Sequence, residues 1–297
     1  MSPLVSVAVV TYNQRPFLEE CLNSILAQDY PEIEIVVADD GSIDGTAELL
    51  RRYERDHPGK FVVRLSPENR GVTANHNVAL GACTGKYIAW IGGDDLMLPG
   101  KIAAQVAHME ANRDCNICYH DVELFESESG RTIQRWSEFD RQRSGTFATL
   151  VRYGHFNTGM SSMVRASASP ASFDESIPVA SDWLYYVTCL ADGGTIEPVP
   201  GIYARQRRYS QNVTASPDPS QPAKLFLEHL QSCAIIMGRW PRAARHARYR
   251  MSRLLLMQRW QDGGGHYAEF LRASLGVRFS PKVLAALTAH RLFGIRR

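Results

Sequence analysis

The sequence predicts an α/β fold, in which helices cover the faces of a largely parallel sheet. Apolar, β-branched runs at 5–10, 33–38, 61–65 and 87–91 alternate with stretches whose apolar residues have helical spacing. This alternation is typical of parallel strands joined by crossover helices. With 44% apolar and 22% charged residues, the 297-residue chain has the composition of a globular protein. Its length suits one large domain or two smaller ones.

Each expected helix is placed by its apolar spacing and by its flanking residues. The turn Asp44-Gly45-Thr46 is expected to cap the second helix, and Pro99 is expected in the first turn of the fourth. Further strands are expected at 115–125 and 159–164. The predicted helices span 17–27, a segment around 49–50, 75–80, 99–109, 183–190, two segments of 223–261 that break near Pro241, and one last piece near the C-terminus.

The fourth predicted strand ends in Gly92-Gly93-Asp94-Asp95, which places two adjacent carboxylates directly after a buried strand. In an open α/β sheet, ligands bind in the crevice beyond the carboxyl ends of the strands. Two carboxylates there can hold a hard divalent cation, and the cation can hold a diphosphate. The alternatives are a solvated Asp-Asp turn and a pair of helix-capping acids.

Polar residues also follow the other strands of the predicted sheet at the same edge. Thr11-Tyr12-Asn13 ends the first strand, Asp40 ends the second, and Arg70 follows the third. An ionised Asp40 can accept the N–H of a pyrimidine base, Tyr12 can stack on its ring, and Arg70 can bind a base edge or a phosphate. Turn formation by Asp40 and a surface ion pair of Arg70 are the alternatives. The chain contains no GxGxxG or GxxxxGKS motif, which leaves dinucleotide-binding and P-loop assignments without support.

The net charge of +2 conceals an uneven distribution. The segment 239–297 has 13 Lys and Arg against two acids, a net charge of +11, so the rest of the chain carries −9. In this segment Arg239, Arg242, Arg245 and Arg248 recur every three residues beside apolar positions. A basic amphipathic helix of this kind suits an anionic lipid surface. Packing on the acidic part of the chain, dimer formation and a solvated surface remain open alternatives.

Neither the N-terminal sequence nor the cysteines predict secretion. The chain starts Met1-Ser2-Pro3 without a signal-peptide pattern, and it has no run of 18 apolar residues, so we expect neither export nor a membrane span. The six cysteines are scattered, and we expect them to be reduced thiols. Cys115 and Cys118 have CxxC spacing, but no second pair and no His-x₃-His accompany them, so this motif does not predict a zinc site.

The order and spacing of several motifs resemble those of one known family. Across the first 110 residues or so, the sequence is similar to the family 2 inverting glycosyltransferases of GT-A fold, and a weaker similarity continues to about Thr214. The motifs that carry this resemblance are Val5-Ser6-Val7, Thr11-Tyr12-Asn13, Ser24-Ile25-Leu26-Ala27-Gln28, Asp39-Asp40-Gly41-Ser42-Ile43-Asp44-Gly45-Thr46, Asn69-Arg70-Gly71, Gly85-Lys86-Tyr87-Ile88 and Asp94-Asp95-x-x-x-Pro99.

The resemblance implies a mixed, Rossmann-like GT-A sheet with helices on both faces, followed by a smaller helical C-terminal region. It assigns 1–215 to the catalytic domain, with a nucleotide-binding half at 1–112 and an acceptor-binding half at 113–215. The proline-rich segment 216–222 is expected to be the linker to the helical region 223–297.

The resemblance also implies roles for the residues at the sheet edge. Tyr12 and Asp40 become contacts to uracil or thymine, and Arg70 becomes a contact to the base or diphosphate. Asp94 corresponds to the sugar- or ribose-contacting acid, and Asp95 to the ligand of Mn²⁺ or Mg²⁺. The same donor site includes Thr11, Asn13 and Asn77. Many members carry a further acid where this sequence has Gly92, which implies that fewer carboxylates hold the metal.

The family's catalytic base corresponds to Asp182, an acid followed by an aromatic residue at the start of a helix; its usual acidic neighbour is Ser181 here. A carboxylate can take the proton of an acceptor hydroxyl as that hydroxyl attacks the anomeric carbon. Capping of the helix 183–190 is the alternative role. Arg205 and Arg207 match cationic positions of a loop that closes over the diphosphate, and a basic surface run is their alternative.

The function implied is a metal-dependent inverting glycosyltransferase that moves a sugar from a UDP- or dTDP-sugar to a hydroxyl of a glycan or lipid-linked glycan. The resemblance is to enzymes of bacterial polysaccharide synthesis, and we expect a cytoplasmic protein that contacts the inner face of the membrane through its basic C-terminal helices. Nucleic acid is not an expected partner. The alternatives are a non-catalytic nucleotide-sugar-binding scaffold and a sugar nucleotidyltransferase; the sequence leaves the sugar, acceptor and oligomeric state open.

Overall fold

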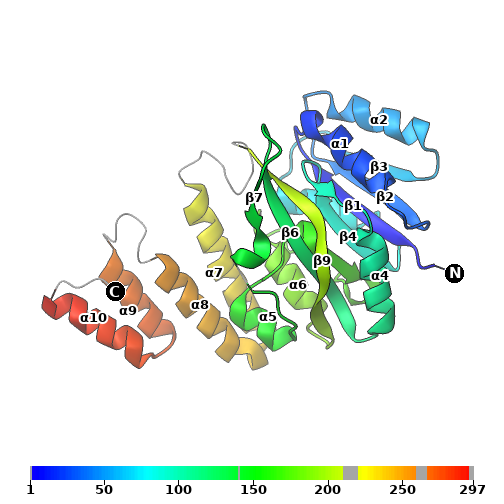
Figure 1. Ribbon diagram of the computed structural model, residues 1–297. Helices are drawn as coiled ribbons and strands as arrows, with labels where there is room; N and C mark the ends of the chain where they lie inside the picture. The colour runs from blue at the N-terminus through cyan, green and yellow to red at the C-terminus, as the bar shows by residue number, and fades with distance from the viewer. Residues whose placement is uncertain (1, 140, 210–219, 259–265, 294–297) are drawn as a thin grey trace. The chain divides into compact units, whose positions relative to one another are not determined.

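A computed structural model describes residues 2–139, 141–209, 220–258 and 266–293 and confirms the α/β class (Figure 1). The described strands form a nine-stranded mixed sheet in the order β3-β2-β1-β4-β8-β6-β9-β5, with β7 paired to β6. The chain divides into two compact units. Unit 1 comprises 1–147 and 155–221, and unit 2 comprises 148–154 and 222–297.

The first four strands form the parallel half of the sheet, as the sequence predicts. β1 lies between β2 and β4, and both pairings are parallel and in continuous register. Because consecutive strands run the same way, their carboxyl ends lie at one edge. The strands are β1 Val5–Thr11, β2 Ile33–Asp39, β3 Phe61–Leu65 and β4 Tyr87–Gly92.

The second half of the sheet is mixed. β8 is antiparallel to β4 and β6, β9 is parallel to β6, and β5 is antiparallel to β9. The strand β9 therefore brings residues more than 100 positions apart in the chain to the loop that follows β4. The strands are β5 Leu96–Met97, β6 Cys115–Glu126, β7 Thr132–Arg135, β8 Ser162–Arg165 and β9 Thr195–Arg208.

Helices cover both faces of the sheet, as expected. Side chains from α1, α2 and α4 pack with the β1, β2 and β4 strands in one apolar cluster that includes Leu18, Leu50 and Ile102. On the other face α3 contacts β1 and β2, and α6 contacts β6. The helices of unit 1 are α1 Arg15–Leu26, α2 Thr46–Asp56, α3 Val72–Leu80, α4 Lys101–Ala111 and α6 Asp182–Cys189, with short 3₁₀ turns η1 Trp136–Glu138, η2 Gly159–Ser161 and η3 Ala166–Ala168.

Several sequence-based boundaries are wrong. Helix α4 starts at Lys101 with Gly100 in a left-handed conformation at its N-cap, so Pro99 precedes the helix. The predicted strand at 159–164 begins as the turn η2. The largest error concerns Arg205 and Arg207, which lie on the 14-residue strand β9 and not in a loop. Their alternating pattern was hidden because β9 contains two prolines and a glycine, which are rare inside strands.

Unit 2 is helical. The break predicted near Pro241 is confirmed as a 3₁₀ turn between two helices, whereas the single last helix expected is two helices. Tyr267, Leu271, Val283 and Leu287 form the apolar cluster of these last two helices. The helices are α5 Phe147–Tyr153, whose Phe147 is counted with unit 1, α7 Gln221–Arg239, η5 Pro241–Ala243, α8 Ala244–Gln258, α9 Tyr267–Val277 and α10 Pro281–Phe293.

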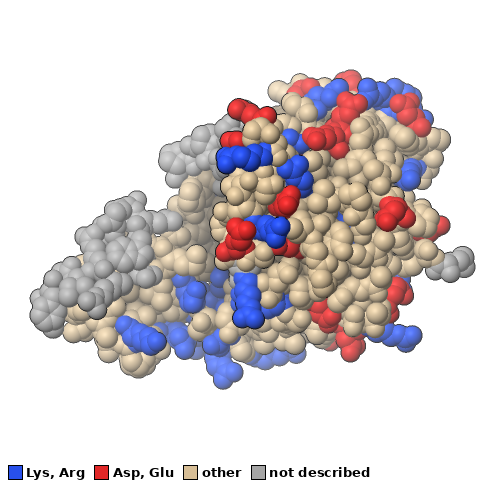
Figure 2. All heavy atoms as spheres, viewed as in Figure 1, with Lys and Arg blue, Asp and Glu red and all other residues tan. Residues whose placement is uncertain are grey.

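The surface of unit 2 keeps the basic character read from the sequence. Figure 2 shows Lys and Arg side chains gathered on the visible side of this unit, and exposed arginines of α8 include Arg245, Arg248 and Arg253. None of the described helices is both long and apolar enough to cross a membrane. The segment 210–214 of the family resemblance and most of the predicted linker 216–222 lie outside the described residues.

Candidate active site

The carboxyl ends of β1, β2 and β4 are tied together by hydrogen bonds. The Thr11 carbonyl accepts the N–H of Asp40 at 3.1 Å, and the Val10 carbonyl accepts the N–H of Gly93 at 2.9 Å. The side-chain amide of Asn75, from α3, donates to the carbonyls of Thr11 (3.3 Å) and Ala38 (3.0 Å). The acids that follow β2 and β4 therefore lie at one edge, on either side of β1.

Asp40 is buried and organises the loop that precedes α3. Its two carboxylate oxygens accept the backbone N–H groups of Arg70 (2.9 Å) and Gly71 (2.8 Å). The next residue, Gly41, has a φ of +74°, and a Cβ there would lie 2.6 Å from the Glu68 carbonyl carbon, so only glycine suits this turn. The Arg70 side chain is exposed, and within the described residues its guanidinium has no partner.

Asp94 and Asp95 lie buried in the loop between β4 and β5. The Asp95 carboxylate accepts the backbone N–H of Arg207 at 2.9 Å, and the Asp94 carboxylate accepts the hydroxyl of Tyr209 at 3.0 Å. Burial raises the pKa of both carboxyls, and the charge of Asp94 raises the pKa of Asp95 further. Two adjacent, largely buried acids thus repel each other, and a bound cation would relieve this repulsion.

Arg207 is buried beneath this loop, and its guanidinium contacts several other residues. Its guanidinium donates to the Asp94 carbonyl at 2.8 Å, to the Ser127 hydroxyl at 3.3 Å and to the Glu20 carboxylate. The same group lies over the ring of Phe17, at 4.7 Å from its centroid. Arg207 therefore fixes the acidic loop, with three of its five N–H donors already engaged.

The residues around the acidic pair fit a hard divalent cation. The carboxylates of Asp94 and Asp95 offer oxygen atoms, and oxygen ligands are the preference of Mg²⁺ and Mn²⁺. Two buried oxygens, Thr11 Oγ1 and Gln14 Oε1, have no hydrogen-bond partner within the described residues, and both lie within 3 Å of the position that a Cβ on Gly93 would take. Gly92 stands where many members of the family have an acid. A Cβ on Gly92 would lie 2.9 Å from Asp94 Oδ1, so the Asp94 side chain occupies the space next to this position.

Asp182 is the first residue of α6, and its carboxylate accepts the N–H of Trp183 at 2.8 Å. Ser181 occupies the N-cap, so the alternative that Asp182 caps this helix is wrong by one position. The Ser181 hydroxyl lies 2.8 Å from that of Thr73, at the start of α3. Asp182 is thus joined to the Asp40 loop through Thr73 and Gly71.

More than half of the sequence matches a known protein family. The model described as glycosyl transferase family 2 matches residues 6–169, which is more than half of the chain. The chain belongs to this family. Among curated relatives of this family 2 protein, the putative teichuronic acid biosynthesis glycosyltransferase TuaG of Bacillus subtilis is 35% identical over 122 residues, which are 41% of this chain and 48% of TuaG. The chain spans 60% of the length of other relatives.

Solved structures show the same GT-A fold. The structure of TarS residues 1–349 from S. aureus, in complex with UDP-GlcNAc, matches with a TM-score of 0.70 over 97% of this chain and 87% of that chain, at 18% identity. Mannosyltransferase PcManGT from Pyrobaculum calidifontis, in complex with GDP-Man and Mn²⁺, matches with a TM-score of 0.61 over 98% of this chain and 80% of that chain, at 20% identity. These likenesses and the mixed sheet confirm the predicted fold class.

The remaining donor-site residues of the family 2 chain lie in different surroundings. Tyr12 is 42% exposed, and Asn13, at a φ of +51°, accepts the N–H of Ile43 at 3.0 Å. The Asn77 amide binds the backbone of Phe173 and the carboxylate of Glu175, so within the described residues it holds the 173–175 segment. Arg205 donates to the Gly130 carbonyl and pairs with Glu123. The donor roles of these residues stay predictions.

The structure adds residues that sequence reasoning missed. Gln14 and Tyr209 hydrogen bond to Asp94, and Glu20 pairs with Arg207. Lys101 is wholly buried, and burial lowers its pKa to about 7, while its ammonium donates to the Met160 carbonyl at 2.6 Å. Gln14 follows directly on Thr11-Tyr12-Asn13, which was an available signal; the others come from distant segments and had none.

Proposed function

We propose that this family 2 protein transfers a sugar from a UDP- or dTDP-sugar to a hydroxyl of a glycan or lipid-linked glycan, with inversion at the anomeric carbon and with Mn²⁺ or Mg²⁺. The observation that carries the proposal is the buried Asp94–Asp95 pair beside the ends of β1 and β2. Buried, mutually repelling carboxylates favour a cation, and a cation at this edge favours a diphosphate.

The nucleotide occupies the edge between Tyr12 and Arg70 in this proposal. Tyr12 is exposed enough to stack on a base, and the Arg70 guanidinium is free, within the described residues, to bind a base edge or phosphate. Asp40 already accepts two backbone N–H groups, but a carboxylate has about four acceptor sites, so a base N–H can still reach it. TarS with UDP-GlcNAc and PcManGT with GDP-Man support a nucleotide-sugar donor.

Asp95 would hold the cation, and Asp94 would hold the cation or the donor sugar. When bound, a divalent cation neutralises charge on the leaving diphosphate. The manganese of PcManGT supports this cofactor class. In this proposal Arg207 also positions these carboxylates, because its guanidinium donates to the Asp94 carbonyl and its backbone N–H donates to the Asp95 carboxylate.

Asp182 is the proposed base. Its carboxylate has accepting capacity beyond its bond to the Trp183 N–H, and it lies at the start of α6, next to the Asp40 loop. The carboxylate accepts the proton of the acceptor hydroxyl while that oxygen bonds to the anomeric carbon and the diphosphate leaves with its bonding electrons. One displacement of this kind inverts the anomeric centre.

The basic surface of unit 2 supports a peripheral contact with the inner face of the membrane. Arg245, Arg248 and Arg253 are exposed on α8, which carries no acid, and each such cation near an anionic lipid surface contributes roughly 1 kcal/mol. In this proposal the enzyme is cytoplasmic and lies next to lipid-linked acceptors. TuaG, named for teichuronic acid biosynthesis, supports an acceptor in polysaccharide synthesis.

A screen of nucleotide sugars by thermal shift, with and without Mn²⁺, tests the donor and its metal. A ligand that binds only the folded state raises the melting temperature. A nucleotide sugar that raises the melting temperature is then used as the donor in turnover assays. The anomeric configuration of the product is determined by NMR. Melting temperatures that no nucleotide sugar changes, with or without Mn²⁺, would contradict the proposal.

Asp182→Asn tests the base. It should lower turnover by about 10²–10⁴-fold and leave nucleotide affinity unchanged, because the base acts only on the acceptor. The matched control is Asp192→Asn, an exposed acid just beyond the opposite end of the same helix, which should keep full turnover. Nucleotide binding without any turnover in the unmodified protein would instead indicate the scaffold alternative.

A further inference from the structure

The CxxC motif of β6 gains a different meaning from the structure. In a regular strand, positions 115 and 118 point to opposite faces. Here Cys115 pairs with Thr195 and Ile117 pairs with Ile196, so Asn116 is an extra residue in a β-bulge. The bulge shifts the alternation, and Cys115 and Cys118 both belong to the apolar cluster on the face that α4 covers.

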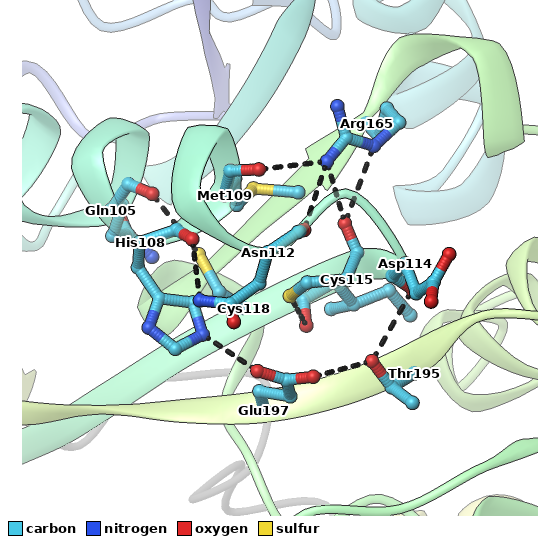
Figure 3. A network of polar contacts seen from close by, with 11 residues as sticks. Gln105, His108, Met109, Asn112, Asp114, Cys115, Cys118, Arg165, Thr195 and Glu197 are labelled. Atoms are coloured by element: carbon cyan, nitrogen blue, oxygen red, sulfur yellow. Dashed lines mark hydrogen bonds and ion pairs between the residues drawn. The ribbon is translucent and has the colours of Figure 1, made fainter.

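Two further side chains with metal-ligating atoms lie beside Cys115. His108, near the end of α4, has its Nε2 2.9 Å from Oε2 of Glu197, on β9 (Figure 3). The ligand atoms of His108, Cys115 and Glu197 all lie within 4.8 Å of one another. Cys115 is fully buried, whereas the side chains of His108 and Glu197 are 21% and 23% exposed. Among the described residues, this is the one such cluster of three.

The three ligands are held by a fixed scaffold. Arg165 donates to the carbonyls of Met109 (3.0 Å), Asn112 (3.4 Å) and Cys115 (3.0 Å), which immobilises the turn between α4 and β6 (Figure 3). The Thr195 hydroxyl donates to Oε1 of Glu197 at 2.6 Å and orients that carboxylate. Hydrogen bonds of this kind fix metal ligands before the metal arrives.

We propose that His108, Cys115 and Glu197 bind Zn²⁺, at a site separate from the Asp94–Asp95 pair. A thiolate, an imidazole and a carboxylate are all zinc ligands, and the sulfur disfavours Mg²⁺ and Mn²⁺. Tetrahedral zinc places its ligand atoms roughly 3.3–3.8 Å apart, so the observed separations require movements of about 1 Å. The two partly exposed ligands, His108 and Glu197, leave a side open to solvent, from which water supplies the fourth ligand.

Binding converts the Cys115 thiol to a thiolate. The thiol, which now donates to the Ile117 carbonyl at 3.2 Å, loses its proton to solvent, and the sulfur lone pair forms the bond to zinc. The metal then joins α4 to β6 and β9; α4 also carries Lys101 and β9 also carries Arg207, both described with the candidate active site. Zinc binding therefore stabilises the folded protein, with one proton released for each ion bound.

The test uses the full chain, treated with a chelator and then titrated with Zn²⁺ against a competing chelator. One tight site is expected, together with a higher melting temperature. Co²⁺ at the same site should give a sulfur-to-metal charge-transfer absorption, which a carboxylate site such as Asp94–Asp95 cannot produce. Asp95→Asn should leave this absorption intact.

Variants separate the ligands from their supports. Cys115→Ser should abolish the charge-transfer absorption, and His108→Gln, a change at a partly exposed position of α4, should abolish tight binding without unfolding the protein. Thr195→Val should weaken binding by about tenfold, the smaller effect of an outer-shell change. Cys83→Ser is the matched control, since this thiol donates to the Ala79 carbonyl and does not belong to the cluster of three, so the variant should bind zinc normally.

Clear results would overturn the inference. If the folded wild-type chain takes up no stoichiometric zinc, or if Co²⁺ binds without a sulfur band, then the cluster is a packed part of the core. Binding that Cys83→Ser weakens as much as Cys115→Ser does would have the same consequence. None of these outcomes depends on the proposed transferase activity, because every readout is binding or stability.

Discussion

Two acids at the same edge of the sheet are treated very differently by their surroundings. Asp40, beyond β2, is buried with both oxygens bonded to backbone N–H groups of the loop before α3. Asp95, beyond β4, is equally buried, but a single backbone N–H, that of Arg207, is its one hydrogen bond within the described residues, and Asp94 lies next to it. Burial alone therefore does not distinguish these acids.

The difference lies in how each negative charge is compensated. Backbone dipoles satisfy Asp40, so its removal should disturb the loop that it holds. The pair Asp94–Asp95 instead places two carboxylates side by side in a buried space, and burial raises the pKa of both carboxyls. A neutral substitution of the structural acid Asp40 should therefore lower the stability of the protein, whereas the same substitution of the metal-binding acid Asp95 should lower metal binding and not stability.

The largest effect is expected for Arg207→Gln. The change removes the bonds of the guanidinium to the Asp94 carbonyl and to Glu20, and it removes a positive charge that stabilises the buried Asp94 and Asp95 carboxylates. The loss of this buried cation should cost about 3–5 kcal/mol in the free energy of unfolding. Arg205→Gln, two residues earlier on β9, removes a more exposed pair with Glu123 and should cost about 1 kcal/mol or less. Urea unfolding measures both; equal losses would show that Arg207 does not support the acidic loop.

Asp95→Asn should weaken Mn²⁺-supported UDP binding by about a hundredfold or more, because the metal's charge stabilisation is worth several kcal/mol. The same change should leave the metal-free protein as stable as before or more so, because it removes a repulsion between buried charges. Titration calorimetry and thermal melts give the two values. Unchanged UDP binding would remove Asp95 from the metal site.

Asp40→Asn should behave in the opposite way. An amide has one acceptor oxygen in place of two, so a buried backbone N–H of Arg70 or Gly71 loses its partner, at a cost of about 1–3 kcal/mol in unfolding free energy. The loss should be the same with and without Mn²⁺. A destabilisation that Mn²⁺ abolishes would place Asp40 in the metal site, and Asp40 and Asp95 would then not differ in role.

The smallest effect is a pH dependence. Because the pKa of Asp95 is raised, its contribution to the stability of the metal-free protein is complete below its ordinary pKa of about 3.9, and it is lost as pH rises through the raised pKa. Mn²⁺ binds the ionised pair, so its affinity should increase with pH by up to about tenfold per unit in this window. Asp95→Asn should flatten the profile of Mn²⁺ affinity; a wild-type profile without slope would argue against the raised pKa.

Much of unit 1 was predictable because local patterns encode it. The runs that became β1 to β4 are continuous and apolar, and the strand-end residues Asp40, Asp94 and Asp95 follow them directly, so their shared edge could be inferred. The role of Arg207 could not be inferred. Its partner Glu20 is 187 positions away, and the strand that carries it contains residues that usually interrupt strands.

The sequence by itself determined the α/β class, the family resemblance and the set of polar residues at one sheet edge, since strand periodicity and adjacency in the chain specify these. Only the tertiary structure decided which acids are compensated, that Arg207 is buried, and that a bulge puts both cysteines of the CxxC motif on the face that α4 covers, with Cys115 beside His108 and Glu197. Such outcomes depend on contacts between distant segments, and the energy of a buried charge is set by whichever groups the fold brings around it.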